Sequence, residues 1–141
     1  MTTLDAWLAR YGESHRNPVN EAIHWICVPA IAWSVIALAW WVTPYAAIGL
    51  CAMALAFYAV LSVPVALGML VFVGLAIEAC VRLDRHVAAV AVAVFVVAWI
   101  GQFAGHKVEG RKPAFLDDVK FLLIGPAWVL ATLMRRLRIR C

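Results

Sequence analysis

Long apolar runs constrain this chain more than any other feature of its sequence. Apart from Glu78, the charged residues between positions 22 and 104 are confined to residues 82–86. A helix of about 20 apolar residues crosses the roughly 30 Å hydrocarbon core of a bilayer. Hydrophobic residues make up 66% of the 141 residues, whereas soluble domains contain about 45–50%. The sequence therefore predicts an all-α integral membrane protein with a single domain over residues 1–141.

Prolines and polar residues divide the apolar sequence into four expected transmembrane helices. Asn17 and Pro18 start the first, because Asn caps a helix and Pro suits its first position. Thr43-Pro44 and Ser62-Val63-Pro64 separate the next two, and the charged turn 82–86 precedes the last. The predicted spans are 18–42, 46–61, 65–81 and 87–104.

Both ends of the chain carry further expected segments. Leu4, Trp7, Leu8 and Tyr11 follow a helical period, which predicts an amphipathic helix over residues 3–14 within an interfacial segment 1–16. That helix lies either in the membrane interface or against the bundle. Beyond the last span we expect a polar loop over 105–120, a re-entrant or interfacial helix over 121–134, which is too short to span, and a basic tail over 135–141.

Positive charge predicts the orientation, because cytoplasmic loops are enriched in Lys and Arg. With four spans, one side holds only Arg82 and Arg85, and the other holds the remaining ten Lys and Arg residues. Both termini are therefore expected in the cytoplasm, in a bacterial inner membrane or in the endoplasmic reticulum of a eukaryote. The polar start of the chain is not typical of a cleavable signal peptide. The net charge of +4 fits membrane orientation, not nucleic-acid binding, and no obligate protein partner is indicated.

The four histidines are the main functional signal. The span count places His15, His24 and His106 at one membrane face with Glu109, and His86 at the other. Ionisable groups near membrane segments indicate a functional site, and imidazole and carboxylate suit Fe(II), Zn or Mn. The three histidines are candidate metal ligands, with Glu109 or His86 as a possible fourth donor. The alternative for each single histidine is a solvated or helix-capping role.

Two polar residues lie close in sequence to the candidate metal ligands. Asn20 lies one turn before His24 and is expected to hydrogen-bond its imidazole, and Gln102 lies near His106.

The four cysteines are Cys27, Cys51, Cys80 and Cys141, and no two of them form a close-spaced pair. We therefore expect no disulfide framework and no cysteine metal site.

Two motifs carry a resemblance to a known family. The first is His-x-Asn-Pro-x-Asn-x-x-x-His, preceded by a Tyr and followed by a Pro: Tyr11, His15, Asn17, Pro18, Asn20, His24 and Pro29. The second comprises Trp99, Gln102, Phe103, Gly105 and His106, then Glu109, Arg111, Lys112, Pro113 and Ala114. Together they resemble the small membrane proteins typified by the yeast iron-dependent 2-hydroxy-fatty-acid dioxygenase of the endoplasmic reticulum. The resemblance covers nearly the whole chain.

The resemblance implies a function and a site. It implies Fe(II)-dependent α-oxidation, in which O2 converts a 2-hydroxy fatty acid to an acid one carbon shorter. It implies His15, His24, His106 and Glu109 as catalytic residues, the three histidines as metal ligands, and as supporting residues Tyr11, Asn17, Asn20 and Gln102. Arg111 or Lys112 would pair with the substrate carboxylate, and the acyl tail would lie among the helices in the bilayer.

Two other classes of function compete with this hypothesis. One is a non-enzymatic lipid-binding or assembly protein whose histidines cap helices. The other is a zinc-dependent membrane hydrolase, which is disfavoured because the chain lacks a His-Glu-x-x-His element.

Overall fold

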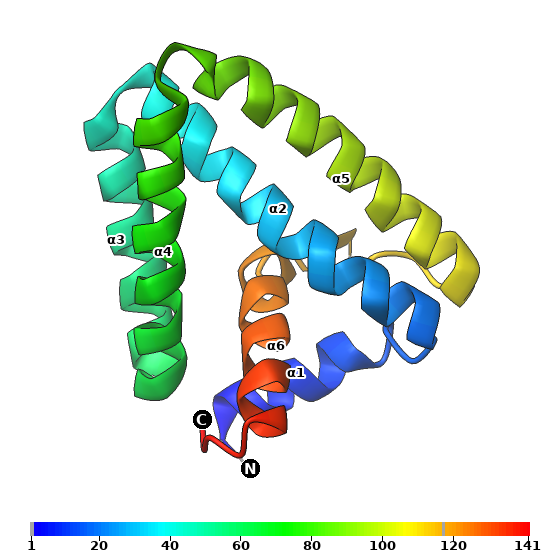
Figure 1. Ribbon diagram of the computed structural model, residues 1–141. Helices are drawn as coiled ribbons and strands as arrows, with labels where there is room; N and C mark the ends of the chain where they lie inside the picture. Colours follow the sequence, from blue (N-terminus) through cyan, green and yellow to red (C-terminus); the bar gives the residue numbers. More distant parts are fainter. Residues whose placement is uncertain (1, 117) are drawn as a thin grey trace.

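The computed structural model describes residues 2–116 and 118–141, and these residues form helices and connecting loops without a strand (Figure 1). The helices are α1 (Thr3–Gly12), α2 (Pro18–Val42), α3 (Pro44–Leu61), α4 (Val63–Leu83), α5 (Val87–Glu109) and α6 (Phe121–Arg136), with short 3-10 turns η1 (Asp84–His86) and η2 (Ala114–Leu116). The prediction of an all-α protein is confirmed.

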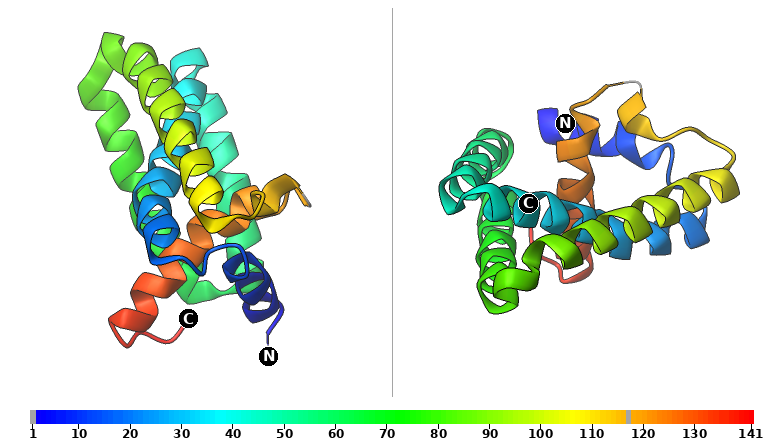
Figure 2. Two further views of the ribbon diagram at one scale, coloured as in Figure 1. Left: turned by 90° about the vertical axis from the view of Figure 1, so that its right-hand side faces the viewer. Right: turned by 90° about the horizontal axis from the view of Figure 1, so that it is seen from above.

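Two helix pairs form the frame of the molecule. Helices α3 and α4 lie side by side, and α2 packs along α5 at an angle to them (Figure 1). The pairs meet near the η1 turn and diverge towards the other end, where α1 and α6 lie (Figures 1 and 2). Helix α6 contacts both α2 and α4. The two termini lie at the same end of the molecule, away from η1.

Three helical stretches are long and apolar enough to cross a membrane: Pro18–Val42, Pro44–Leu61 and Val63–Glu109. The third comprises α4, η1 and α5, and the chain reverses at Asp84, whose φ is 47° (Figure 1). Its two arms have 21 and 23 residues, and each matches the length that a bilayer of about 30 Å requires. The structure fits a membrane protein, and the count of four spans stays a prediction.

Helices α3 and α4 begin two residues before their predicted starts at 46 and 65. Pro44 and Pro64 lie in the first turns of these helices, where a missing N–H breaks no helical hydrogen bond. The side chains of Thr43 and Ser62 cap them by accepting from backbone N–H groups of Tyr45 and Val65, both at 3.4 Å. Each proline therefore belongs to the first turn of a helix and not to the connection that precedes it.

Helix α5 continues through the first five residues of the predicted loop 105–120, which corrects that boundary. It ends at Gly110, which has a left-handed φ of 74° and donates its N–H to the His106 carbonyl at 3.0 Å. Gly105 lies inside the helix. His106 and Glu109 are consequently held by a helix and not by a loop.

The N-terminal helix packs against the C-terminal one. Helix α1 buries Leu4, Leu8 and Tyr11, and the rings of Trp7 and Phe121 of α6 form a T-shaped pair with centroids 5.4 Å apart. Of the two predicted locations for this helix, the structure shows contact with the bundle, and its depth in the membrane stays a prediction.

Helix α6 extends two residues beyond the predicted 121–134 and is anchored at both ends. Near its C-terminal end Arg136 lies 3.6 Å from Glu21 and over the ring of Trp25, whereas residues 137–141 of the basic tail are exposed. At its N-terminal end the hydroxyl of Tyr58 on α3 donates to the carbonyl of Leu123 at 2.6 Å. This anchoring holds α6 between the two helix pairs.

Replacing Tyr58 by Phe should lower the free energy of unfolding by about 1 kcal/mol, because one buried hydrogen bond is lost while the ring remains. Denaturant unfolding of the purified protein in detergent measures this. Tyr45→Phe is the matched control, since Tyr45 is 85% exposed and Tyr58 only 2%. Equal stability of the two variants would contradict a stabilising role for the Tyr58 bond.

Candidate metal centre

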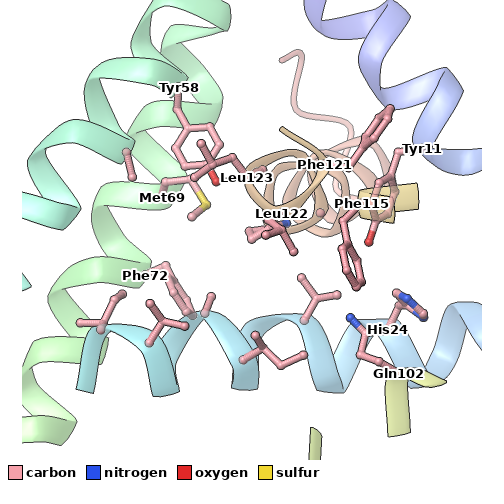
Figure 3. A pocket seen from close by; sticks show the side chains of 18 of the residues that line it. Tyr11, His24, Tyr58, Met69, Phe72, Gln102, Phe115, Phe121, Leu122 and Leu123 are labelled. Atoms are coloured by element: carbon pink, nitrogen blue, oxygen red, sulfur yellow. Dashed lines mark hydrogen bonds between the residues drawn. The ribbon is translucent and has the colours of Figure 1, made fainter. Parts of the chain in front are cut away.

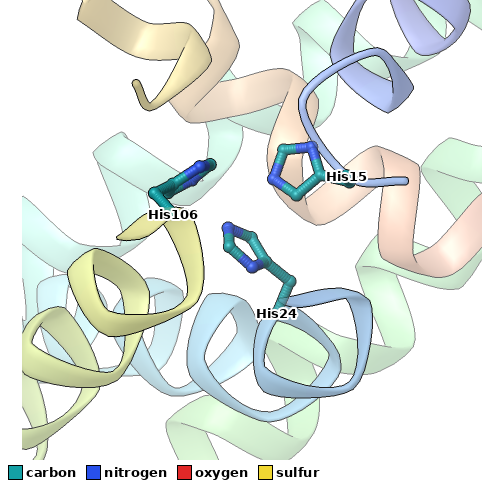
Figure 4. A group of neighbouring side chains, drawn as sticks. All are labelled: His15, His24 and His106. Atoms are coloured by element: carbon teal, nitrogen blue, oxygen red, sulfur yellow. The ribbon is translucent and has the colours of Figure 1, made fainter. Parts of the chain in front are cut away.

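Three segments bring three imidazoles to one point (Figure 4). His15 lies in the loop after α1, His24 in the second turn of α2, and His106 in the last turn of α5. They are 4%, 1% and 6% exposed. One ring nitrogen from each can be chosen so that the three atoms lie within 4.8 Å of one another. The three histidines that the sequence predicted on one membrane face are therefore neighbours in space.

Hydrogen bonds to the backbone determine which ring nitrogen of His15 and of His24 is free to bind a metal. Nδ1–H of His15 donates to the Tyr11 carbonyl at 2.7 Å, and Nδ1–H of His24 donates to the Asn20 carbonyl at 2.9 Å. A carbonyl only accepts, so Nε2 of each neutral ring carries the lone pair. The expected contact of Asn20 with His24 is thus made by the Asn20 backbone and not by its side-chain amide.

Unpaired ring nitrogens are what a metal site requires. Within the described residues, Nε2 of His15, Nε2 of His24 and Nδ1 of His106 are buried without a hydrogen-bond partner. Leaving such atoms unpaired costs about 1–3 kcal/mol each. Three neutral imidazoles fit Fe(II), Zn or Mn and leave coordination positions open for other ligands. The donor set of this cluster therefore fits a metal ion.

Aromatic rings pack against His15, which lies in a loop and not in a helix. Tyr11 stacks on its imidazole with centroids 4.2 Å apart and planes 11° apart, and Trp128 of α6 lies 5.3 Å away. Burial lowers the pKa of His15 to about 4, which keeps the ring neutral and able to bind a metal at neutral pH. Sequence reasoning missed Trp128, because nothing in its local sequence points to His15.

Glu109 joins the start of α2 to the end of α5. Its Oε1 accepts from the Arg16 N–H at 3.0 Å, and its Oε2 accepts from the Asn17 N–H at 2.8 Å and from Nδ2 of Asn20 at 3.2 Å. A carboxylate is favoured there by the positive end of the helix dipole. Both oxygens accept hydrogen bonds, so Glu109 is a clamp that joins the two helices beside the cluster.

The other supporting residues lie around this clamp. The side chain of Asn17 caps α2 by accepting from the Val19 N–H at 2.9 Å, and Nδ2 of Asn20 also donates to the Ser14 carbonyl at 3.0 Å. A Cβ at position 105 would collide with Oδ1 of Asn20. Gly105 thus lets α5 approach α2 closely.

His86 lies outside the cluster. It is exposed in the η1 turn, where Nε of Arg85 lies 3.3 Å from its Nε2. His106 follows it by twenty positions, a distance of about 30 Å at the helical rise per residue. His86 is therefore excluded as a fourth donor to the same ion.

Two basic residues follow α5. Nη1 of Arg111 donates to the Glu13 carbonyl at 2.9 Å, which ties the loop after α5 to the end of α1. Lys112 is exposed next to it. The pairing of either residue with a substrate carboxylate stays a prediction.

A cavity of about 410 Å³ opens from the histidine cluster (Figure 3). His24 and Gln102 lie at one end, and Met69 and Phe72 of α4 line it away from them; His106 also lines the cavity. Its walls come from α1 to α6 and η2 and are almost entirely apolar. Sequence reasoning did not locate this cavity, because its lining residues look like ordinary membrane-helix residues.

The fold and site define a helical membrane protein with a buried three-histidine centre at the end of an apolar cavity. The chain matches the family described as 2-hydroxy-palmitic acid dioxygenase Mpo1-like over residues 1–137. It is 33% identical over 136 residues to the 2-hydroxy-palmitic acid dioxygenase MPO1 of Saccharomyces cerevisiae. The aligned region covers 90% of this chain and 77% of the yeast protein. No solved structure matches it. The protein belongs to the Mpo1-like family.

Replacing His15, His24 or His106 singly by Ala should weaken metal binding more than about 100-fold, because the loss of a mere supporting residue already costs about 10–100-fold. Metal content and anaerobic Fe(II) titration of the purified variants measure this. His86→Ala should bind like the unaltered protein. Equal effects at all four histidines would contradict the assignment of the centre.

Glu109→Ala should weaken metal binding about 10–100-fold while stoichiometric binding persists at high metal concentration, as expected for a residue that orients ligands. The same titration tests it, with the exposed neighbour Lys107→Ala as control. Complete loss of binding, as in His106→Ala, would instead identify Glu109 as a ligand.

Proposed function

We propose that the protein is an Fe(II)-dependent dioxygenase that shortens 2-hydroxy fatty acids by one carbon at the cytoplasmic face of the membrane. One observation carries the proposal: the buried histidine cluster opens directly onto a long apolar cavity. A fatty acid needs both features, since its tail is apolar and its reacting carbons lie at the polar end. The name of the yeast relative, 2-hydroxy-palmitic acid dioxygenase, supports the same substrate class.

The overall reaction converts a 2-hydroxy acid and O2 to the shorter acid, carbon dioxide and water. The bond between the carboxyl carbon and the hydroxyl-bearing carbon breaks, and the latter becomes the new carboxyl group. This uses all the oxidising equivalents of one O2, so no further reductant is required. Bound Fe(II) would supply the redox chemistry for O2, and the 2-hydroxy and carboxylate oxygens are suitable partners for it.

The chain itself positions and shields the substrate. His15, His24 and His106 would hold the metal with their buried nitrogens. The apolar walls of the cavity exclude water and favour the tail by about 0.8 kcal/mol for each buried methylene. This places the first two carbons of the substrate at the cluster.

Two polar atoms lie along the path of the head group. Oε1 of Gln102 and Nε1 of Trp99 are buried without a partner among the described residues, and both side chains line the cavity. We assign Gln102 to the 2-hydroxy or carboxyl group of the substrate, because its amide both donates and accepts. Arg111 and Lys112, outside the cavity lining, would attract the carboxylate during entry.

A lipid-binding protein without enzymatic activity is the second candidate, favoured by the cavity alone. It would not require three converging imidazoles with unpaired nitrogens. A zinc-dependent hydrolase would use the same donors but would cleave an ester or amide and consume no O2. Oxygen consumption and iron dependence therefore separate the three candidates.

Purified protein loaded with Fe(II) should convert 2-hydroxypalmitate to pentadecanoic acid in air, measured by mass spectrometry with oxygen uptake in parallel. Palmitate, which lacks the 2-hydroxyl, should give no product. His24→Ala should be inactive and His86→Ala fully active. The absence of the shorter acid with folded, iron-loaded protein and oxygen would overturn the proposed activity on this substrate.

A further inference from the structure

We propose that the side chains at the far end of the cavity, centred on Val73 of α4, set the longest acyl tail that the protein accepts. This inference rests on the proposed function, because it assumes that the tail of a 2-hydroxy fatty acid fills the cavity.

The cavity has a wall of buried side chains at its far end. This wall is formed by Ile36 of α2, Cys51 of α3 and Val73, which line the cavity and are only 7%, 4% and 9% exposed. The same three residues form one core cluster with Ala47 and Ala76. Three helices meet at this layer, so a tail that continues along α2 meets packed side chains there.

The distance from the histidines to this wall suits one acyl chain. The lining residues of α2 begin at His24 and end at Ile36, with at least one in every turn between them. Twelve residues of helix span about 18 Å. One leaflet of a bilayer, filled by single acyl chains, is about 15 Å thick, half of the hydrocarbon core. An extended long-chain tail thus fits along α2 with its head group at the cluster.

The wall produces a limit because its side chains are closely packed. Each methylene that finds room in the cavity improves binding by about fourfold. A methylene beyond the wall must displace packed side chains, and such overpacking is unfavourable. The kcat/KM for a 2-hydroxy acid is therefore expected to rise with tail length until the tail reaches the wall, and to fall for longer tails.

Val73 offers variants in both directions with a matched control. Val73→Phe shortens the cavity, and Val73→Ala lengthens it. Val71 is the same residue type on the same helix but is 63% exposed towards the surroundings, so Val71→Phe and Val71→Ala control for effects on folding and on membrane insertion. Val73→Phe and Val73→Ala are expected to shift the longest accepted tail in opposite directions, so either variant alone tests the inference if the other fails to fold.

The measurement is competition among 2-hydroxy fatty acids that differ by two carbons, with every product quantified by mass spectrometry. Val73→Phe should lower the relative kcat/KM of the longest accepted acid by about fourfold for each methylene displaced, with shorter acids unaffected. Val73→Ala should raise that of the next longer acid. The Val71 variants should match the unaltered protein.

A second readout does not depend on turnover: displacement of a fluorescent fatty acid from the metal-free protein by the same series. An unchanged length profile in the Val73 variants, while the unaltered protein is active, overturns the inference and leaves the proposed function intact. Equal shifts in the Val71 variants also overturn it. A length shift at Val73 in displacement, without turnover by any protein, supports the inference and overturns the proposed function.

Discussion

The carboxylate of Glu109 makes the contact on which the rest of the site depends. It binds backbone N–H groups at the start of α2 from the last turn of α5, and so joins two helices that are far apart in sequence. Gly105 permits this close approach, because the Asn20 side chain occupies the space of a Cβ. With the helix ends fixed in this way, His24 and His106 face each other, with ring centroids 4.8 Å apart.

The remaining polar atoms show where the fold departs from a plain membrane bundle. Among the described residues, the buried side-chain atoms without hydrogen-bond partners belong to His15, Asn20, His24, Trp99, Gln102 and His106. Four of these residues line the cavity or meet at the metal centre from α2 and α5, and His15 joins them from the loop after α1. Unpaired buried atoms are unfavourable, so their concentration at one place is the physical signature of a ligand-binding site.

Local chemistry made parts of the fold predictable. The bounds of α2, 18–42, agree with the prediction, because Asn17 caps, Pro18 occupies the first position and Thr43 ends the helix. The end of α5 was not predictable in the same way, since both Gly105 and Gly110 are plausible ends. Only packing decides between them: Gly105 is needed for contact with α2, and Gly110 adopts the left-handed conformation.

The sequence by itself determined the all-helical class with its long apolar helices, most helix starts and the choice of His15, His24 and His106 as candidate ligands, because hydropathy, capping and charge act over short distances along the chain. Tertiary structure decided the contacts of Glu109, the exclusion of His86, the aromatic support of His15 by Trp128 and the cavity that reaches Val73. These features depend on how helices approach one another, and an apolar residue that lines a cavity has the same local sequence signal as one that faces lipid.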